Sequence, residues 1–117
     1  MYNKIQRIAD YYGYEVQSRQ LIEEMAELTK AINKLWRFEH GYLTSYYAGY
    51  KKDAVVNICR EEIVEEIADV EICLEYVKQL LDITVEEVDE VKETKVEREL
   101  NRIADRELDK RTFERTK

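Results

Sequence analysis

Apolar and polar residues alternate along most of this chain with the period of an α-helix. Apolar side chains recur at steps of three and four residues over 21–35 and again over 63–81, which is the pattern of a helix with one apolar face. Shorter runs with the same period occupy the two ends of the chain. We therefore predict an all-α fold, a bundle of four main helices at about 3–12, 15–38, 53–81 and 84–110.

Local signals mark several ends of these helices. Gly13 suits the position just after a helix C-terminus, because glycine adopts positive φ without strain. Thr84, followed three residues later by Glu87, makes a capping box at the start of the last helix. The segment 39–52 breaks the helical period with glycines and tyrosines and is predicted to be an aromatic connector, and the polar residues 111–117 are predicted to fray.

Composition and charge narrow the class of protein. The 117 residues include no proline and only three glycines, which favours helices, and this length supports one modest core. We therefore expect a single helical domain over 1–117. The formal charge of −7 argues against a nucleic-acid partner. The N-terminus lacks an apolar signal segment and no apolar run could span a membrane, so we expect no membrane partner and a cytoplasmic location.

Two eight-residue segments repeat one pattern with an offset of 42 residues. Residues 21–28 and 63–70 each contain two aliphatic residues, two glutamates, an aliphatic residue, alanine, an acid and an aliphatic residue. At about 100° per residue, the second glutamate and the last acid of each segment fall on one flank of the apolar stripe. If the two stripes pack together, four carboxylates can converge. These acids are Glu24, Glu27, Glu66 and Asp69.

Convergence of four carboxylates would have an electrostatic cost. Two like charges about 4 Å apart repel by around 4 kcal/mol at an effective dielectric constant near 20. The acids must therefore be partly protonated, turned into water, or neutralised by a cation. Oxygen ligands favour a hard divalent ion, Mg²⁺ or Mn²⁺. A di-iron site is disfavoured, because it needs Glu-x-x-His motifs and the single histidine, His40, lies outside both segments.

The alternative is that these acids belong to an ordinary solvated helix face. Charged residues make up 38% of the chain, and most glutamate pairs on helices support ion pairs along the surface. Two such motifs that recur in a matched context, with few basic residues interleaved among their acids, favour a site instead. The flank of the second motif also carries apolar side chains, so its acids interrupt a partly apolar line. These neighbours are Val55, Cys59, Cys73 and Leu80.

The two motifs resemble those of the MazG-like all-α nucleoside triphosphate pyrophosphohydrolases, which pair a Glu-x-x-Glu helix with a Glu-x-x-Asp helix. The resemblance covers about residues 15–100. It implies Mg²⁺-dependent cleavage of a nucleoside triphosphate to the monophosphate and pyrophosphate, through a metal-activated water that attacks the α-phosphorus. It also implies a homodimer or a dimer of dimers. The metal ligands and catalytic residues would be Glu24, Glu27, Glu66 and Asp69, with Glu23 and Glu65 in support.

Further residues are candidates for substrate binding, each with a plainer alternative. Gln17 and Gln20 continue the line of the first acidic motif and lie either at the edge of the site or on the helix surface as ordinary amides. The resembling family uses a basic cluster after its acidic helices to hold phosphates. The matching residues here could equally form a salt-bridged helix face. They are Lys92, Lys95 and Arg98.

The tyrosines of the connector 39–52 also allow two interpretations. They could stack on a nucleotide base, or they could cover the end of the bundle or a subunit interface. Narrow apolar stripes bury little surface in a monomer, which favours association into at least a homodimer. Two other functional classes remain open, a helical interaction protein without catalysis and a sensor that binds a metal or nucleotide without turnover.

Overall fold

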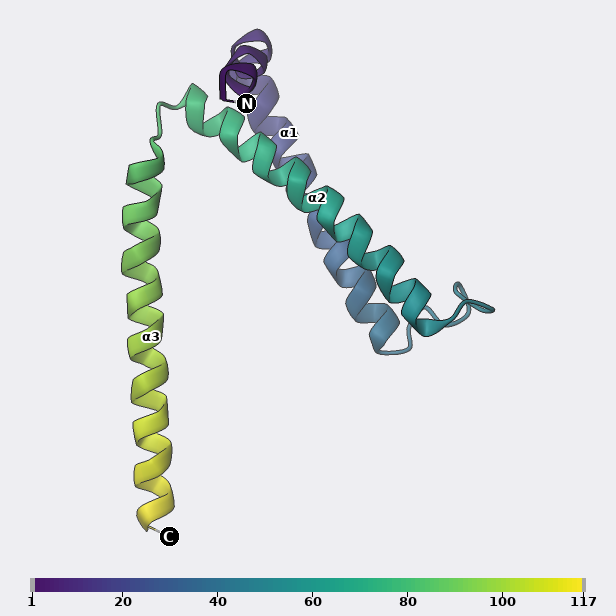
Figure 1. The fold of residues 1–117 in the computed structure, drawn as a ribbon, viewed down its shortest axis with the longest axis vertical. Coiled ribbons are helices and arrows are strands. Elements are labelled where there is room, and N and C mark those ends of the chain that lie inside the picture. The colour runs from purple at the N-terminus through teal and green to yellow at the C-terminus, as the bar shows by residue number, and fades with distance from the viewer. Residues whose placement is uncertain (1, 117) are drawn as a thin grey trace. The chain divides into compact units, whose positions relative to one another are not determined.

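The computed structural model describes residues 2–116, and its regular structure is entirely helical. Three helices follow one another, α1 (Tyr2–Glu39), α2 (Lys52–Leu80) and α3 (Val85–Thr116) (Figure 1). The all-α class is therefore confirmed. The chain divides into two compact units, Met1–Asp82 with α1 and α2, and Ile83–Lys117 with α3. The expectation of a single domain stays a prediction.

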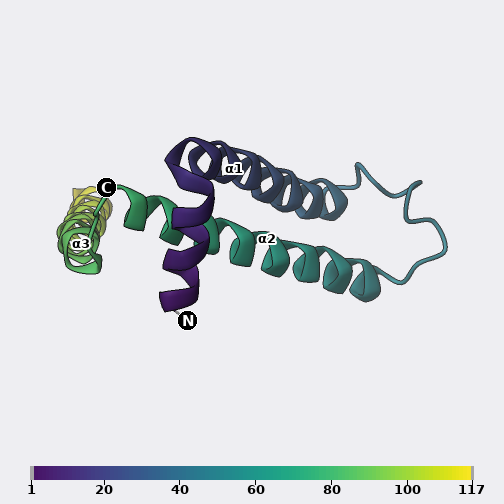
Figure 2. The ribbon, with the colours of Figure 1, turned by 90° about the horizontal axis from the view of Figure 1, so that it is seen from above.

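Helix α1 contains two helices that we predicted separately, so the described chain has three helical elements instead of four. The backbone leaves helical geometry at Gly13, with φ of 83° and ψ of 170°. Any residue with a Cβ would be strained at this φ, which explains the glycine. The segment before Gly13 turns and lies beside the C-terminal part of α2 (Figures 1 and 2), where it buries Ile5 and Ala9.

Helix α3 begins as expected but extends further than expected. The backbone N–H of Glu87 donates to Thr84 Oγ1 (3.1 Å), and the backbone N–H of Thr84 donates to Glu87 Oε2 (2.7 Å), so the capping box is present. The hydrogen bonds that the backbone N–H and the hydroxyl of Thr84 donate to the Glu87 carboxylate lower the pKa of Glu87. Residues 111–116, predicted to fray, are helical, because they contain strong helix formers and no glycine or proline. Lys117 lies outside the described residues.

Helices α1 and α2 form an antiparallel hairpin, in which the buried face of α2 is turned from the predicted apolar stripe toward its acidic flank. Val70 of the expected apolar stripe is buried, whereas Ile67, Leu74 and Leu81 of that stripe are each at least 40% exposed. A helix in a two-helix hairpin can bury only one face, and small side chains let the two backbones approach more closely. Small side chains occupy the neighbouring flank, which carries the acids. The buried residues of α2 are Val55, Cys59, Val70 and Cys73.

The connector closes one end of the hairpin. Tyr47 is buried there with Val55 and Cys59, and its ring meets Phe38 edge to face at a centroid distance of 5.5 Å. For Tyr47 the packing interpretation therefore holds. The other three tyrosines of the connector are exposed, namely Tyr42, Tyr46 and Tyr50.

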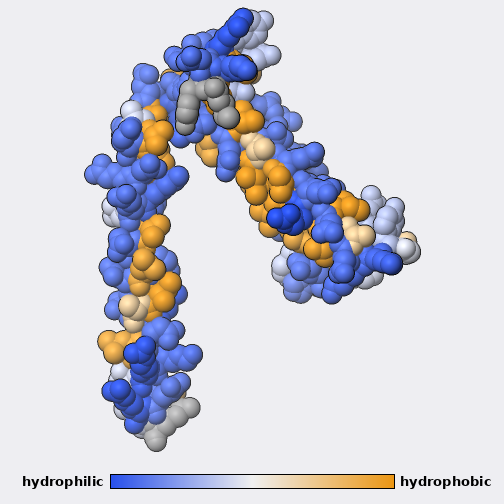
Figure 3. Space-filling model, viewed as in Figure 1, coloured by the Kyte–Doolittle hydropathy of each residue, from blue (hydrophilic) through white to orange (hydrophobic). Residues whose placement is uncertain are grey.

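Both units expose apolar side chains (Figure 3). Along α1, four exposed apolar residues recur at steps of three, seven and four residues and lie on one side of the helix. We call them the outer α1 line. On α3, no residue from Val85 to Thr116 is buried. These exposed surfaces do not make a membrane span, because no helix of residues 2–116 is both long and apolar enough to cross a bilayer. The outer α1 line consists of Ile22, Met25, Ile32 and Trp36.

We expect Val55→Ala to lower the free energy of unfolding by about 2 kcal/mol, because it removes two methyl groups from a fully buried site and leaves a cavity. Val64→Ala on the same helix is the matched control. Its side chain is 54% exposed, so its effect should stay within about 0.5 kcal/mol. Denaturant unfolding followed by circular dichroism measures both. Equal midpoints for the two variants would contradict the described core.

Candidate metal centre

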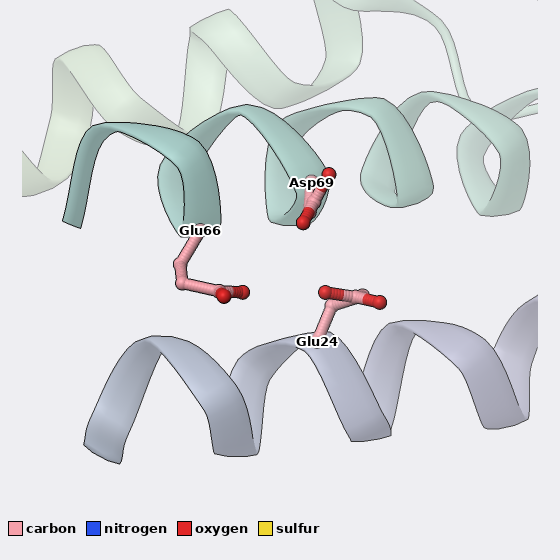
Figure 4. A group of neighbouring side chains, drawn as sticks. All are labelled: Glu24, Glu66 and Asp69. Carbon is pink, nitrogen blue, oxygen red and sulfur yellow. The ribbon is translucent and has the colours of Figure 1, made fainter. Parts of the chain in front are cut away.

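Three of the four predicted carboxylates meet between α1 and α2. Glu24 from α1 and Glu66 and Asp69 from α2 each contribute one oxygen, and these oxygens all lie within 4.8 Å of one another. Figure 4 shows the three side chains pointing toward one another between the two helices. Glu24 and Glu66 are half-buried, whereas Asp69 is exposed. We call these three residues the carboxylate cluster. The cluster is therefore open to water at Asp69.

The spacing of the sequence explains why these acids face inward. Seven residues make almost two whole turns of an α-helix, so residues seven apart lie on one line. Glu66 lies seven residues after Cys59 and seven before Cys73, and both cysteines are buried. Asp69 follows Glu66 by one turn. The corresponding line of α1 has buried residues at its two ends, and it consists of Gln17, Glu24 and Ala31.

One carboxylate oxygen of Glu66 lacks a hydrogen-bond donor within residues 2–116. Its Oε2 is buried and has no hydrogen-bond partner among the described residues. The pKa of this carboxyl is raised above its ordinary value of 4.5, first because burial disfavours the charged form and then because neighbouring carboxylates repel it. Among these carboxylates Asp69 has the largest effect, followed by Glu24, Glu27 and Glu65.

The donor set of the carboxylate cluster fits a hard divalent cation. A buried carboxylate oxygen without a hydrogen-bond donor is unfavourable unless it binds a proton or a cation. Three carboxylates with oxygens this close would share one Mg²⁺ or Mn²⁺ ion, since both ions prefer oxygen ligands. The residues that would hold the ion are Glu24, Glu66 and Asp69.

Glu27, the fourth predicted ligand, lies outside the carboxylate cluster. It follows Glu24 by three residues, so on the helix it is turned by about 60° from the line that faces α2. Glu27 is exposed, but its charge contributes to the raised pKa of Glu66, so it lies near the cluster. The proposed supporting acids Glu23 and Glu65 are both exposed, and their roles stay predictions.

Neither of the two predicted glutamines of α1 is a fully exposed amide. Gln20 Nε2 donates to Glu24 Oε1 at 2.7 Å and so fixes the orientation of that carboxylate. Gln17 is only 5% exposed, so it is not the surface amide of the alternative interpretation. Whether either amide binds substrate stays a prediction.

The predicted basic residues Lys92, Lys95 and Arg98 belong to α3 and to the unit Ile83–Lys117. All three are exposed. The carboxylate cluster lies in the other unit, Met1–Asp82. A role of these bases in phosphate binding therefore stays a prediction.

A groove of about 470 Å³ adjoins the carboxylate cluster, and the basic residues that line it were missed by the sequence analysis. These three bases follow Glu27 on α1 at steps of three, four and three residues, so they continue its helical line away from the cluster. That spacing was a signal that could have found them. The lining includes Glu27, Glu66, Lys30, Lys34, Arg37 and, from the connector, Tyr46.

Lys34 is occupied by a structural contact across the hairpin. Its Nζ lies 3.1 Å from a carboxylate oxygen of Glu62 on α2 and 5.8 Å from the centroid of the Tyr47 ring. The Tyr47 side chain and then the Glu62 carboxylate raise the pKa of Lys34. The ion pair therefore joins α1 to α2 beside the groove.

No protein-family model, curated protein or solved structure matches this chain. What the arrangement can do is therefore argued from its chemistry. The carboxylate cluster offers oxygen ligands for a divalent ion, the exposed Asp69 leaves it open to water, and the adjoining groove contains basic side chains among its acids. This combination suits a ligand that carries phosphate groups.

We expect Glu66→Gln to stabilise the protein at neutral pH in the presence of a chelator. The pKa of Glu66 is raised by folding, so the native state binds more protons than the unfolded state once the pH exceeds about 4.5, and stability falls as the pH rises. The neutral amide removes this loss. The difference in Tm between the variant and the wild type should be absent below about pH 4 and should grow toward pH 7.

Thermal unfolding between pH 4 and pH 8 tests this expectation, with Glu23→Gln as the control because Glu23 is an exposed acid on α1. A variant at Glu66 that unfolds at a lower temperature than the wild type at pH 7 would contradict the described repulsion.

Proposed function

We propose that this chain is a divalent-metal-dependent nucleoside triphosphate pyrophosphohydrolase, which converts a nucleoside triphosphate and water to the monophosphate and pyrophosphate. The observation that carries the proposal is the carboxylate cluster of Glu24, Glu66 and Asp69 together with the unpartnered oxygen of Glu66. The resemblance of the two acidic motifs to the MazG-like enzymes supports the class of reaction.

Mg²⁺ is the proposed ion, with Mn²⁺ as a substitute, and the carboxylate cluster is its proposed site. When bound, such an ion neutralises charge on phosphate oxygens and makes water a better nucleophile. Gln20 holds one oxygen of Glu24 and so fixes the direction of the other. Asp69 keeps the solvent-facing side of the cluster open, where a phosphate group can approach.

A hydrolytic reaction also needs a group that accepts the proton of the attacking water. Glu65 lines the groove together with Glu27 and Glu66, whereas Glu23 is not among its lining residues. We therefore assign the acceptor role to Glu65 and leave Glu23 as a surface acid. Glu27, at the edge of the cluster, would contribute a further oxygen to the ion.

The proposal predicts that Glu66→Ala and Asp69→Ala abolish release of pyrophosphate while the helical fold is retained, since removing either acid relieves repulsion. Glu71→Ala, an exposed acid of the same helix, is the matched control and should keep full activity. The assay measures pyrophosphate release from a panel of canonical and modified nucleoside triphosphates with Mg²⁺.

The outcomes separate the functional classes. An unchanged Tm on adding Mg²⁺, with no turnover, would support a helical interaction protein instead. A rise in Tm without release of pyrophosphate from any triphosphate would support a sensor. Loss of helicity in Glu66→Ala would show that this acid is structural.

Association into at least a homodimer forms part of the proposal. The outer α1 line and Ile67 and Leu74 of α2 are exposed apolar residues, and their burial against a second copy would stabilise both chains. A dimer of dimers could use more than one of these surfaces.

We expect light scattering at micromolar concentration to give a mass at least twice the 14.1 kDa of one chain. Ile67→Lys should lower that mass, because it places a charge on an exposed apolar surface without disturbing the buried face. Val64→Lys, a second exposed position of α2, serves as the comparison. A wild-type mass of 14.1 kDa alone would refute association.

A further inference from the structure

Two basic residues in the groove beside the carboxylate cluster have no described partner. Lys30 and Arg37 line the groove from α1, and both are exposed. The third base, Lys34, is paired with Glu62, whereas no ion pair within residues 2–116 includes Lys30 or Arg37. The two unpaired cations can therefore bind an anion that enters the groove.

The balance of charge in the groove makes such binding depend on a metal. Once Lys34 and Glu62 neutralise each other, the remaining acids outnumber the two unpaired bases by one charge. These acids are Glu27, Glu65 and Glu66. The carboxylate cluster adds the charges of Glu24 and Asp69, and a divalent cation held there would offset two of these negative charges. An anion should therefore bind well only when the cation is present.

The spacing of the bases indicates the shape of the anion. Lys30 follows Glu27 by one helical turn, and Arg37 follows Lys30 by two turns, which is about 10 Å along the helix. The positive charges thus form a line that leads away from the carboxylates. A chain of linked phosphates that begins at the cation can meet both bases, whereas a single phosphate group can meet only one.

We propose that Lys30 and Arg37 bind the polyphosphate chain of the nucleoside triphosphate in this groove. The inference rests on the proposed function, because it needs a divalent cation at the carboxylate cluster. It places the phosphate-binding bases on α1, in the same unit as the cluster, instead of at Lys92, Lys95 and Arg98 of α3.

The test uses the full chain and inorganic tripolyphosphate, which carries the phosphate chain without a base or sugar. Isothermal titration calorimetry should detect binding to the wild type with Mg²⁺ and much weaker binding with a chelator. The double variant Lys30→Gln with Arg37→Gln should bind about 100-fold more weakly, since each lost contact between a cation and a phosphate weakens binding roughly 10-fold.

The matched control is Arg19→Gln with Lys52→Gln, which removes the same charge from exposed positions outside the groove. It should bind within about twofold of the wild type. Salt screens the attraction between these two distant charges and the bound anion, so their loss has little effect on affinity. All four residues are exposed, so both double variants should keep the wild-type melting curve.

Several results would overturn the inference. These are an absence of binding to the wild type, equal binding with and without Mg²⁺, and equal affinities for the two double variants. Loss of binding only when Lys92, Lys95 and Arg98 are replaced by glutamine would assign the phosphates to α3 and would also overturn it.

Failure of the proposed function gives a different pattern. If no nucleoside triphosphate releases pyrophosphate, yet Mg²⁺ and tripolyphosphate bind and the groove variant loses that binding, the function fails and the role of the two bases stands. If the wild type releases pyrophosphate and the groove variant keeps the wild-type KM, the inference fails and the function stands.

Discussion

Repulsion between carboxylates at the centre of a two-helix hairpin is the constraint on which this structure depends. Glu66 occupies a position where packing alone would favour an apolar side chain, since Cys59 and Cys73 are buried two turns before and after it. Its carboxyl loses water on burial and faces other acids. An apolar residue of similar size would remove both costs. A position that works against folding is best explained by the chemistry that it permits.

The hairpin offsets this cost at its two ends. At one end, the connector packs Tyr47 against Val55 and Cys59, and the ion pair between Lys34 and Glu62 joins the helices. At the other end, the segment before Gly13 folds back and covers the C-terminal part of α2. Packing at both ends thus holds the backbones of α1 and α2 in register while the centre carries charge. The ends supply stability and the centre supplies ligands.

The sequence predicted the elements better than it predicted their faces. The break at Gly13 and the capping box of Thr84 depend on the conformation of a few neighbouring residues, so they can be recognised locally. The choice between two apolar flanks of α2 cannot be recognised from neighbouring residues, because Ile67 and Cys59 both belong to periodic apolar lines. That choice depends on how closely α1 can approach. The flank that packs inward in turn determines which acids meet between the two helices.

The same reasoning explains the candidate site. Glu24, Glu66 and Asp69 were recognised from two matched motifs, but the exclusion of Glu27 from the cluster depends on how α1 is turned about its axis. The bases of the groove are spaced along α1 and could have been recognised locally, but the shape of the groove also depends on where the connector places Tyr46, which no local pattern specifies.

Exposed apolar surface and the carboxylate cluster lie on different faces of α2, and this separation bears on how the chain could associate. Ile67 follows Glu66 directly, so their side chains diverge by about 100° around the helix. A second copy that covered Ile67 and Leu74 would bury apolar area without burying the open side of the cluster at Asp69. Association through this face and access of an anion to the cluster are therefore compatible. The face of α2 that packs against α1 leaves Ile67 and Leu74 of the predicted apolar stripe exposed for this purpose.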